Sequence, residues 1–147
     1  MSPPSLSSET LHVSAVAIKG RAVLIGGRSG TGKSDLALRL IDRGADLISD
    51  DYTFIHRVQG QALASAPATI RGKIEVRGVG IVEREPVADI PVALFVDLDG
   101  QPERLPGGEE RISVAGVAIP TVALQGHQAS APLKVEAALL LFGLPAG

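Results

Sequence analysis

The chain has 147 residues, a length that fits one domain. Its 45% hydrophobic and 20% charged residues lie in the globular range and exclude bulk disorder, and the absence of cysteine excludes a disulfide scaffold. A net charge of −2 and only 3% aromatic residues argue against a nucleic-acid partner and against binding to a membrane surface.

The first part of the chain is expected to lie outside the folded domain. Residues 1–9 are mostly serine and proline and offer little apolar surface to bury, so they are interpreted as a disordered tail before a domain at residues 10–147. The apolar runs fall far short of the ~20 residues that cross a bilayer, and the start shows no signal-peptide pattern. These features predict a cytoplasmic protein.

The next segment predicts a hairpin followed by a helix. Residues 11–18 alternate as in a strand, and residues 22–27 form a continuous apolar run of the kind that ends at a sheet edge. From Lys33 to Arg43 apolar residues recur at helical spacing, and Gly44 supplies a stop.

The remainder of the chain is predicted to be rich in strands. A loop is expected at 100–110, two short strands around Gly116, and a last helix after Ser130 that ends at Gly143. The predicted apolar face of that helix consists of Leu133, Ala137, Leu140 and Leu141. The other predicted strands are 45–49, 52–58, 61–66, 73–78, 80–84 and 90–98.

A glycine-rich motif joins the predicted hairpin to the first helix. Gly27 to Ser34 reads GRSGTGKS and satisfies GxxxxGKS in full, between an apolar strand and an amphipathic helix. Glycines let backbone N–H groups turn toward phosphate oxygens, and Lys33 and the Ser34 hydroxyl would serve the terminal phosphates and a magnesium ion. The alternative is a glycine turn that only caps a helix, which does not require Lys followed by Ser. The predicted nucleotide-binding residues are Gly27, Arg28, Ser29, Gly30, Thr31, Gly32, Lys33 and Ser34.

Two adjacent acids close the strand that follows this helix. In a parallel arrangement, Asp50 and Asp51 would lie beside the phosphates. One carboxylate would serve the metal and the other would accept a hydroxyl proton. An acidic cap at a strand end is the alternative. Asp97 after another apolar run is better explained as a simple strand end, and His12 by itself as a structural histidine.

Three segments together carry a family resemblance. GRSGTGKS, ISDD and EVRGVGIV, the last at residues 75–82, resemble the HPr kinase/phosphorylase family, which phosphorylates a serine of HPr, a phosphocarrier of the bacterial phosphotransferase system. The resemblance covers residues 11 to about 142 and matches the catalytic C-terminal domain. It implies an α/β fold: a single P-loop kinase domain of the phosphoenolpyruvate-carboxykinase-like kind, rich in strands, with a P-loop helix and a C-terminal helix.

The resemblance also implies roles for individual residues. Ser34 and Glu75 would hold magnesium, His12 would lie beside the active site, and the base would be Asp50 or Asp51, with Asp51 preferred. Arg77 would either stabilise charge or lock the Glu75 loop. The candidate catalytic residues are His12, Lys33, Asp50, Asp51 and Arg77.

The expected activity is magnesium- and ATP-dependent phosphorylation of an HPr-like protein, in a hexamer by resemblance. The sequence leaves open ATP or pyrophosphate as donor. Residues 125–132, QGHQASAP, lack an arginine that family members carry, and the chain stops near the start of an extension associated with dephosphorylation, so phosphorylase activity is expected to be weak or absent. Two alternatives remain: a nucleotide-sensing module without catalysis, and a small-metabolite P-loop kinase, which normally needs an arginine-rich lid.

Overall fold

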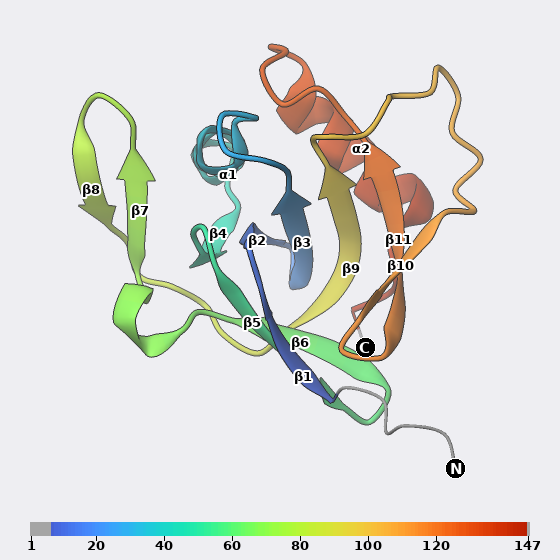
Figure 1. Cartoon of the computed structure of the whole chain (residues 1–147), viewed down its shortest axis with the longest axis horizontal. Coiled ribbons are helices and arrows are strands. Elements are labelled where there is room, and N and C mark those ends of the chain that lie inside the picture. The colour runs from blue at the N-terminus through green and yellow to red at the C-terminus, as the bar shows by residue number, and fades with distance from the viewer. Residues whose placement is uncertain (1–6, 147) are drawn as a thin grey trace.

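A computed structural model describes residues 7–146 and shows a curved mixed sheet, two α-helices and a separate hairpin (Figure 1). The nine-stranded sheet has the order β1-β5-β6-β9-β3-β2-β4, and β11 also pairs with β9 and with β10. The strands are β1 (Ser8–Leu11), β2 (Val13–Ile18), β3 (Arg21–Gly26), β4 (Asp46–Ser49), β5 (Thr53–Val58), β6 (Gln61–Ser65), β7 (Lys73–Val76), β8 (Gly80–Glu83), β9 (Ile90–Asp97), β10 (Arg111–Val114) and β11 (Val117–Ala123). The helices are α1 (Lys33–Asp42), α2 (Ala131–Phe142) and the short 3₁₀ helix η1 (Ala68–Ile70).

The amino-terminal boundary of the fold differs from the prediction. Ser8 and Glu9 belong to β1, which pairs antiparallel with β5, and the Glu9 carboxylate accepts a hydrogen bond from the Ala115 N–H at 2.7 Å. The expected tail is therefore too long by these two residues, and residues 1–6 lie outside the described part. An edge strand is held by its backbone hydrogen bonds, so a polar sequence with little to bury can still form one.

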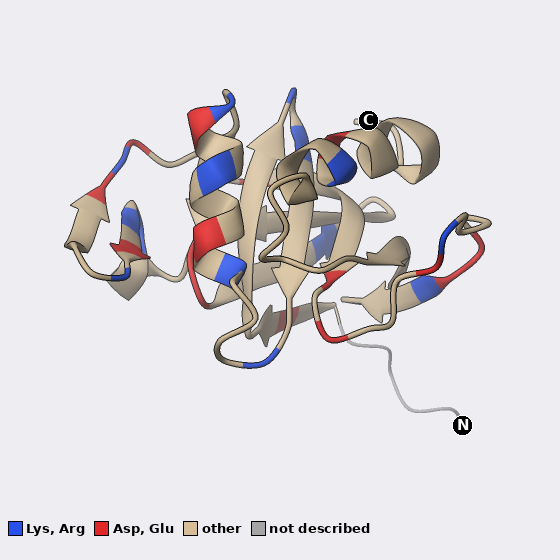
Figure 2. Cartoon of the chain, turned by 90° about the horizontal axis from the view of Figure 1, so that it is seen from above, with Lys and Arg blue, Asp and Glu red and all other residues tan. Residues whose placement is uncertain are grey.

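The predicted hairpin and the first helix are confirmed. β2 and β3 pair antiparallel in register from Val13–Gly26 to Ile18–Arg21, and β3 pairs parallel with β9. Both faces of β3 are covered, which explains its continuous apolar run. Helix α1 places Leu36, Ala37, Leu40 and Ile41 against the sheet, while acidic and basic residues alternate along its ribbon (Figure 2).

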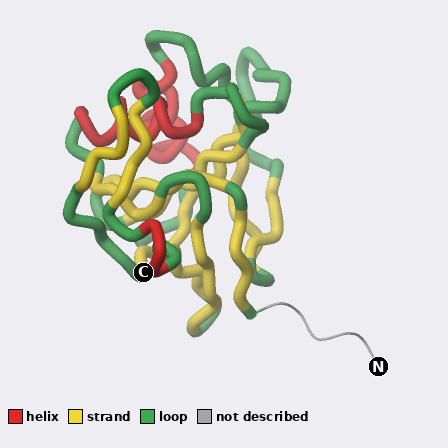
Figure 3. Tube along the Cα trace, turned by 60° about the vertical axis from the view of Figure 1, so that its left-hand side comes forward, coloured by secondary structure: helices red, strands yellow, loops and turns green. Residues whose placement is uncertain are grey.

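The core has two parts, one on each face of the central strands. The first contains Val23 and Ile25 of β3 with residues of α1 and α2, so both helices lie on this face (Figure 3). The second contains Leu24 of β3 and Ile48 of β4 with residues of β5, β6, β10 and β11, which curl over the opposite face. No helix within residues 7–146 has the length and apolarity needed to cross a membrane.

The predicted apolar face of α2 is wrong although its bounds are close. Ala131, Pro132, Val135, Ala138 and Leu139 pack inward, whereas Leu133, Ala137, Leu140 and Leu141 are exposed. Apolar residues occur all round this helix, with only Lys134 and Glu136 charged, so helical periodicity cannot identify the face that meets the sheet. Glu136 forms an ion pair with Arg43 at 2.7 Å, and its hydrogen bond and charge raise the pKa of that guanidinium.

The hairpin of β7 and β8 stands apart from the main sheet (Figure 1). Ile74 and Val82 anchor it to the core beside α1, while Val79 and Ile81 are exposed. This anchoring places Glu75 of β7 beside the end of β4, where its backbone N–H donates to Asp50.

Candidate active site

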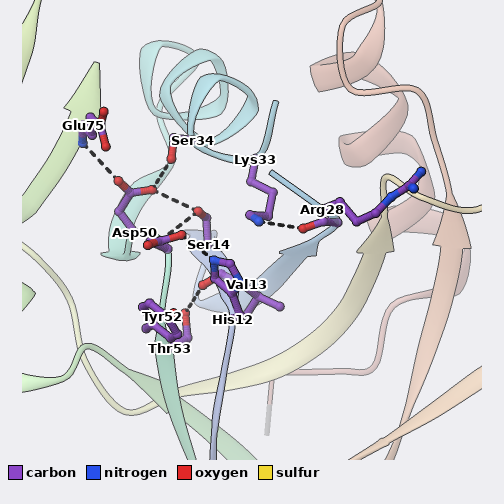
Figure 4. Close-up of polar contacts among 12 residues, drawn as sticks. His12, Val13, Ser14, Arg28, Lys33, Ser34, Asp50, Tyr52, Thr53 and Glu75 are labelled. Carbon is purple, nitrogen blue, oxygen red and sulfur yellow. Dashed lines mark hydrogen bonds and ion pairs between the residues drawn. The ribbon is translucent and has the colours of Figure 1, made fainter. Parts of the chain in front are cut away.

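Ser34 of the P-loop and Asp50, the first of the two adjacent acids, lie at one edge of the sheet (Figure 4). β3 and β4 both pair antiparallel with β2, which lies between them, so they run in the same direction and end at the same edge. Asp50 therefore lies beside Ser34 of the P-loop, and β3 and β4 run parallel to each other with β2 between them.

The backbone carbonyl groups of the P-loop accept hydrogen bonds from side chains of the protein. The Gly27 carbonyl accepts from Lys33 Nζ at 2.6 Å, the Arg28 carbonyl from Thr31 Oγ1 at 2.6 Å, and the Gly30 carbonyl from His127 Nε2 at 2.9 Å. Within residues 7–146, no hydrogen bond engages the N–H groups of Gly30 and Gly32. Free amides at the start of α1, next to the buried Lys33, form a cradle of the kind that suits an anion.

Arg28 and Ser29 form the exposed side of this loop. Asp99, which sequence reasoning missed, accepts from the Arg28 backbone N–H at 3.0 Å and from its Nε at 3.1 Å. The backbone hydrogen bond, with a smaller contribution from the side chain, lowers the pKa of the Asp99 carboxyl. Asp97 accepts the Asp99 N–H at 2.9 Å, which supports its interpretation as a strand-end residue.

Asp50 is a buried carboxylate held by three donors. Its side chain is nearly enclosed, at 7% exposure of the residue. Oδ1 accepts from the hydroxyls of Ser34 at 2.6 Å and Ser14 at 3.0 Å, and Oδ2 accepts from the Glu75 backbone N–H at 3.0 Å. No basic side chain of residues 7–146 forms an ion pair with it. Its position links the P-loop to the β7–β8 hairpin.

Asp51 faces outward beside His12. Its Oδ1 accepts from His12 Nε2 at 2.7 Å, and both side chains are about half exposed, at 57% and 50%. The Asp51 backbone is left-handed with a φ of 70°, and its N–H donates to the Ser14 hydroxyl at 3.1 Å. The Tyr52 ring stacks on His12 with centroids 4.7 Å apart. The Asp51 carboxylate is therefore accessible, and its orientation is fixed by an imidazole partner.

The oxygen groups around Asp50 fit a magnesium ion. The Ser34 hydroxyl and the Asp50 carboxylate are in contact, whereas the exposed residue Glu75 contacts Asp50 through its backbone N–H. Residues 7–146 contain no cluster of three histidine, aspartate or glutamate side chains placed to hold a metal. One or two carboxylates completed by water and phosphate oxygens are, however, typical of magnesium, and a buried carboxylate without a cationic partner favours a cation nearby.

The remaining predicted residue, Arg77, is not brought into this cluster. It lies exposed at the turn between β7 and β8 and makes no hydrogen bond or ion pair with the described residues. Sequence reasoning missed Ser14 and Tyr52. Ser14 had a signal, since it is a lone polar residue inside the apolar strand β2, where a buried hydroxyl must find a partner.

The fold and this site define an α/β P-loop protein with an anion cradle beside two carboxylates. The family model described as HPr Serine kinase C-terminal domain matches residues 5–140, and the chain belongs to this family. The predicted fold class and family resemblance are thereby confirmed.

Named relatives agree with this membership. The HPr kinase/phosphorylase of Clostridium tetani is 44% identical over 79 residues, 53% of this chain and 26% of that protein. The one of Caldicellulosiruptor bescii is 34% identical over 128 residues, 78% of this chain and 41% of that protein. The chain thus matches less than half the length of these relatives. The Hpr(Ser) kinase/phosphatase structure from Coxiella burnetii aligns with a TM-score of 0.75 and 28% identity, covering 90% of this chain and 88% of that one.

Proposed function

We propose that the protein is a magnesium- and ATP-dependent kinase that phosphorylates a serine of an HPr-like phosphocarrier protein. The observation that carries this proposal is the 2.6 Å hydrogen bond between Ser34 of the P-loop and Asp50, because it joins the anion cradle and the acid pair into one site. The names of the relatives, HPr kinase/phosphorylase and Hpr(Ser) kinase/phosphatase, support the choice of substrate.

The P-loop holds the phosphates of the donor in this proposal. Its free amides and the dipole of α1 face the phosphate chain, and Lys33 neutralises charge on the terminal phosphates. Ser34, Asp50 and Glu75 hold magnesium, which when bound neutralises charge on the phosphate oxygens.

Asp51 acts as the base that accepts the proton of the attacking serine hydroxyl. Its carboxylate is exposed to an incoming protein, whereas the Asp50 carboxylate is buried and already accepts three hydrogen bonds. His12 fixes the orientation of the Asp51 carboxylate through the 2.7 Å hydrogen bond. Arg77, at the tip of the projecting hairpin, stabilises charge once the partner protein is bound.

The proposal includes a homo-oligomer. Leu133, Leu140 and Leu141 expose a continuous apolar strip on α2, and a contact between subunits would remove this strip from water.

The deciding experiment is a transfer assay with labelled ATP and magnesium. The protein is incubated with purified HPr, with a panel of phosphate-accepting metabolites, and with neither. Label on a serine of HPr is the expected result. Label on a metabolite would instead identify a small-metabolite kinase, and nucleotide binding without transfer would identify a sensing module. Incubation of serine-phosphorylated HPr with phosphate measures the reverse reaction, which we expect to be weak.

A further inference from the structure

A cavity of about 430 Å³ opens beside the P-loop, on the side away from the acids. Gly30 and Thr31 of the P-loop, Leu98 after β9 and residues 125–128 line it. β9 and β11 lie on one side of β3, whereas β2 and β4 lie on the other, and the two acids directly follow β4. The volume is in the range of small-molecule sites, which are typically ~300–1,000 Å³.

The wall formed by residues 125–128 is held rigidly against the P-loop. Arg39 of α1 donates from Nη1 to the Gln128 carbonyl at 2.9 Å and from Nη2 to the Gly126 carbonyl. A Cβ at Gly126 would lie 2.6 Å from the Thr31 carbonyl oxygen, so only glycine permits this close approach. The cavity is therefore preformed.

His127 places an aromatic ring at this cavity. Its Nε2 lies 2.9 Å from the Gly30 carbonyl oxygen, and because a carbonyl can only accept, Nε2 carries the proton. In the neutral ring this leaves Nδ1 as an acceptor. The ring also lies against Gly32, where a Cβ would meet Cε1 at 3.1 Å, while the residue as a whole is exposed. The ring is thus fixed in orientation and accessible to a ligand.

We infer that this cavity is the nucleoside subsite of the donor, with the base against His127 and Leu98. The inference rests on the proposed function. With the phosphates in the P-loop, the terminal phosphate points toward Asp50 and Asp51, and the other end of the nucleotide extends toward β9 and β11. Leu98 offers apolar surface, the imidazole offers a stacking partner, and the carboxamides of Gln125 and Gln128 offer hydrogen bonds to the edge of a base.

The test compares a ligand that has a nucleoside with one that lacks it. The affinities of ADP and inorganic pyrophosphate are measured by calorimetry with magnesium, for the wild type, His127→Ala and the control His56→Ala on β5. We expect His127→Ala to weaken the binding of ADP about tenfold, within the range measured for loss of base stacking. The affinity for pyrophosphate should not change. His56→Ala should change neither affinity.

A second variant, Gln125→Trp, fills the cavity from an exposed position and should weaken ADP but not pyrophosphate. If His127→Ala weakens the binding of both ligands equally, His127 only organises the P-loop. If the ADP affinity is unchanged in both variants, the base lies elsewhere. Either result overturns the inference. A wild type that binds neither ligand contradicts the proposed function itself. A wild type that binds both ligands, with unaltered variants, contradicts only the subsite.

Discussion

Asp50 and Asp51 are adjacent in the chain but have different surroundings. β4 ends at Ser49, and the left-handed backbone at Asp51 turns the second carboxylate outward, while the first stays buried among hydroxyl and amide donors. These surroundings suit the two acids to different roles. The buried carboxylate suits binding of a metal ion, and the exposed one suits proton transfer to or from a protein substrate.

Replacement of Asp51 tests this division. Asp51→Asn removes the proton acceptor but keeps a side chain that tolerates a left-handed backbone, so we expect kcat to fall by ~10²- to 10⁴-fold with ADP affinity within about twofold. Steady-state phosphorylation of HPr and calorimetry measure the two quantities. Asp46→Asn, at the exposed opposite end of β4, is the matched control. Near-normal turnover in Asp51→Asn would assign the base to another residue.

Lys33 is the second residue whose loss should be decisive. Lys33→Ala removes the buried ammonium group that contacts the Gly27 carbonyl, so charge on the terminal phosphates is no longer neutralised. We expect transfer to HPr to become undetectable while the thermal unfolding transition remains cooperative. Lys19→Ala, in the exposed turn between β2 and β3, serves as the control. Transfer that survived in Lys33→Ala would show that the P-loop does not hold the donor.

The residues of the site differ in how far sequence predicts them. The P-loop can be predicted directly from the sequence because its function requires particular residue types at a fixed spacing over eight residues. Ser14, Tyr52 and His127 act through contacts with segments 37, 40 and 97 residues away in the chain, and only the folded structure brings those segments together. The sequence alone gives His127 no role, since it stands there only within the segment 125–132 that lacks an arginine.

At the scale of elements, periodicity worked where one face of an element is polar. α1 shows this clearly, since its apolar residues lie on one face of the helix and its polar residues on the other. It failed for the inward face of α2, where apolar residues surround the axis, and for β1, whose polar residues are ordered by pairing with β5. In both cases the information lies in the partner element and not in the local sequence.

Two neighbouring leucines of α2 provide a direct test of its orientation. Leu139 is 2% exposed and Leu140 is 80% exposed. Leu139→Ala should lower the free energy of unfolding by ~2–5 kcal/mol because it leaves a cavity in the core. Leu140→Ala should change it by less than ~0.5 kcal/mol. Denaturant titrations of the two variants measure this difference; a larger loss for Leu140→Ala would reverse the assigned face.

At the scale of the whole molecule, the site depends on the order of strands. The acids lie near the P-loop because β2 is inserted between β3 and β4. It runs antiparallel to both, so β3 and β4 point the same way and end at the same edge. Local sequence indicates each strand but not this order, which is set by packing of both sheet faces. β3 and β4 do run parallel, as the prediction from sequence assumed, but the sequence does not show that β2 lies between them.

The apolar strip of α2 gives a prediction for the assembled protein. If it forms the proposed contact between subunits, the double variant Leu140→Lys/Leu141→Lys should lower the mass measured by light scattering and leave the far-ultraviolet circular dichroism unchanged. Leu105→Lys, in the exposed loop between β9 and β10, is the control. An oligomer unchanged by the double variant would place its interface elsewhere.

The left-handed backbone at Asp51 has a consequence for how far this fold can be stabilised. Glycine occupies such a conformation without steric cost, whereas a residue with a Cβ gives up conformational free energy there. A search for hardier variants that scored thermal resistance alone would therefore tend to select glycine at position 51. The carboxylate facing an incoming protein would then be lost, and a gain in heat tolerance would be accompanied by loss of turnover.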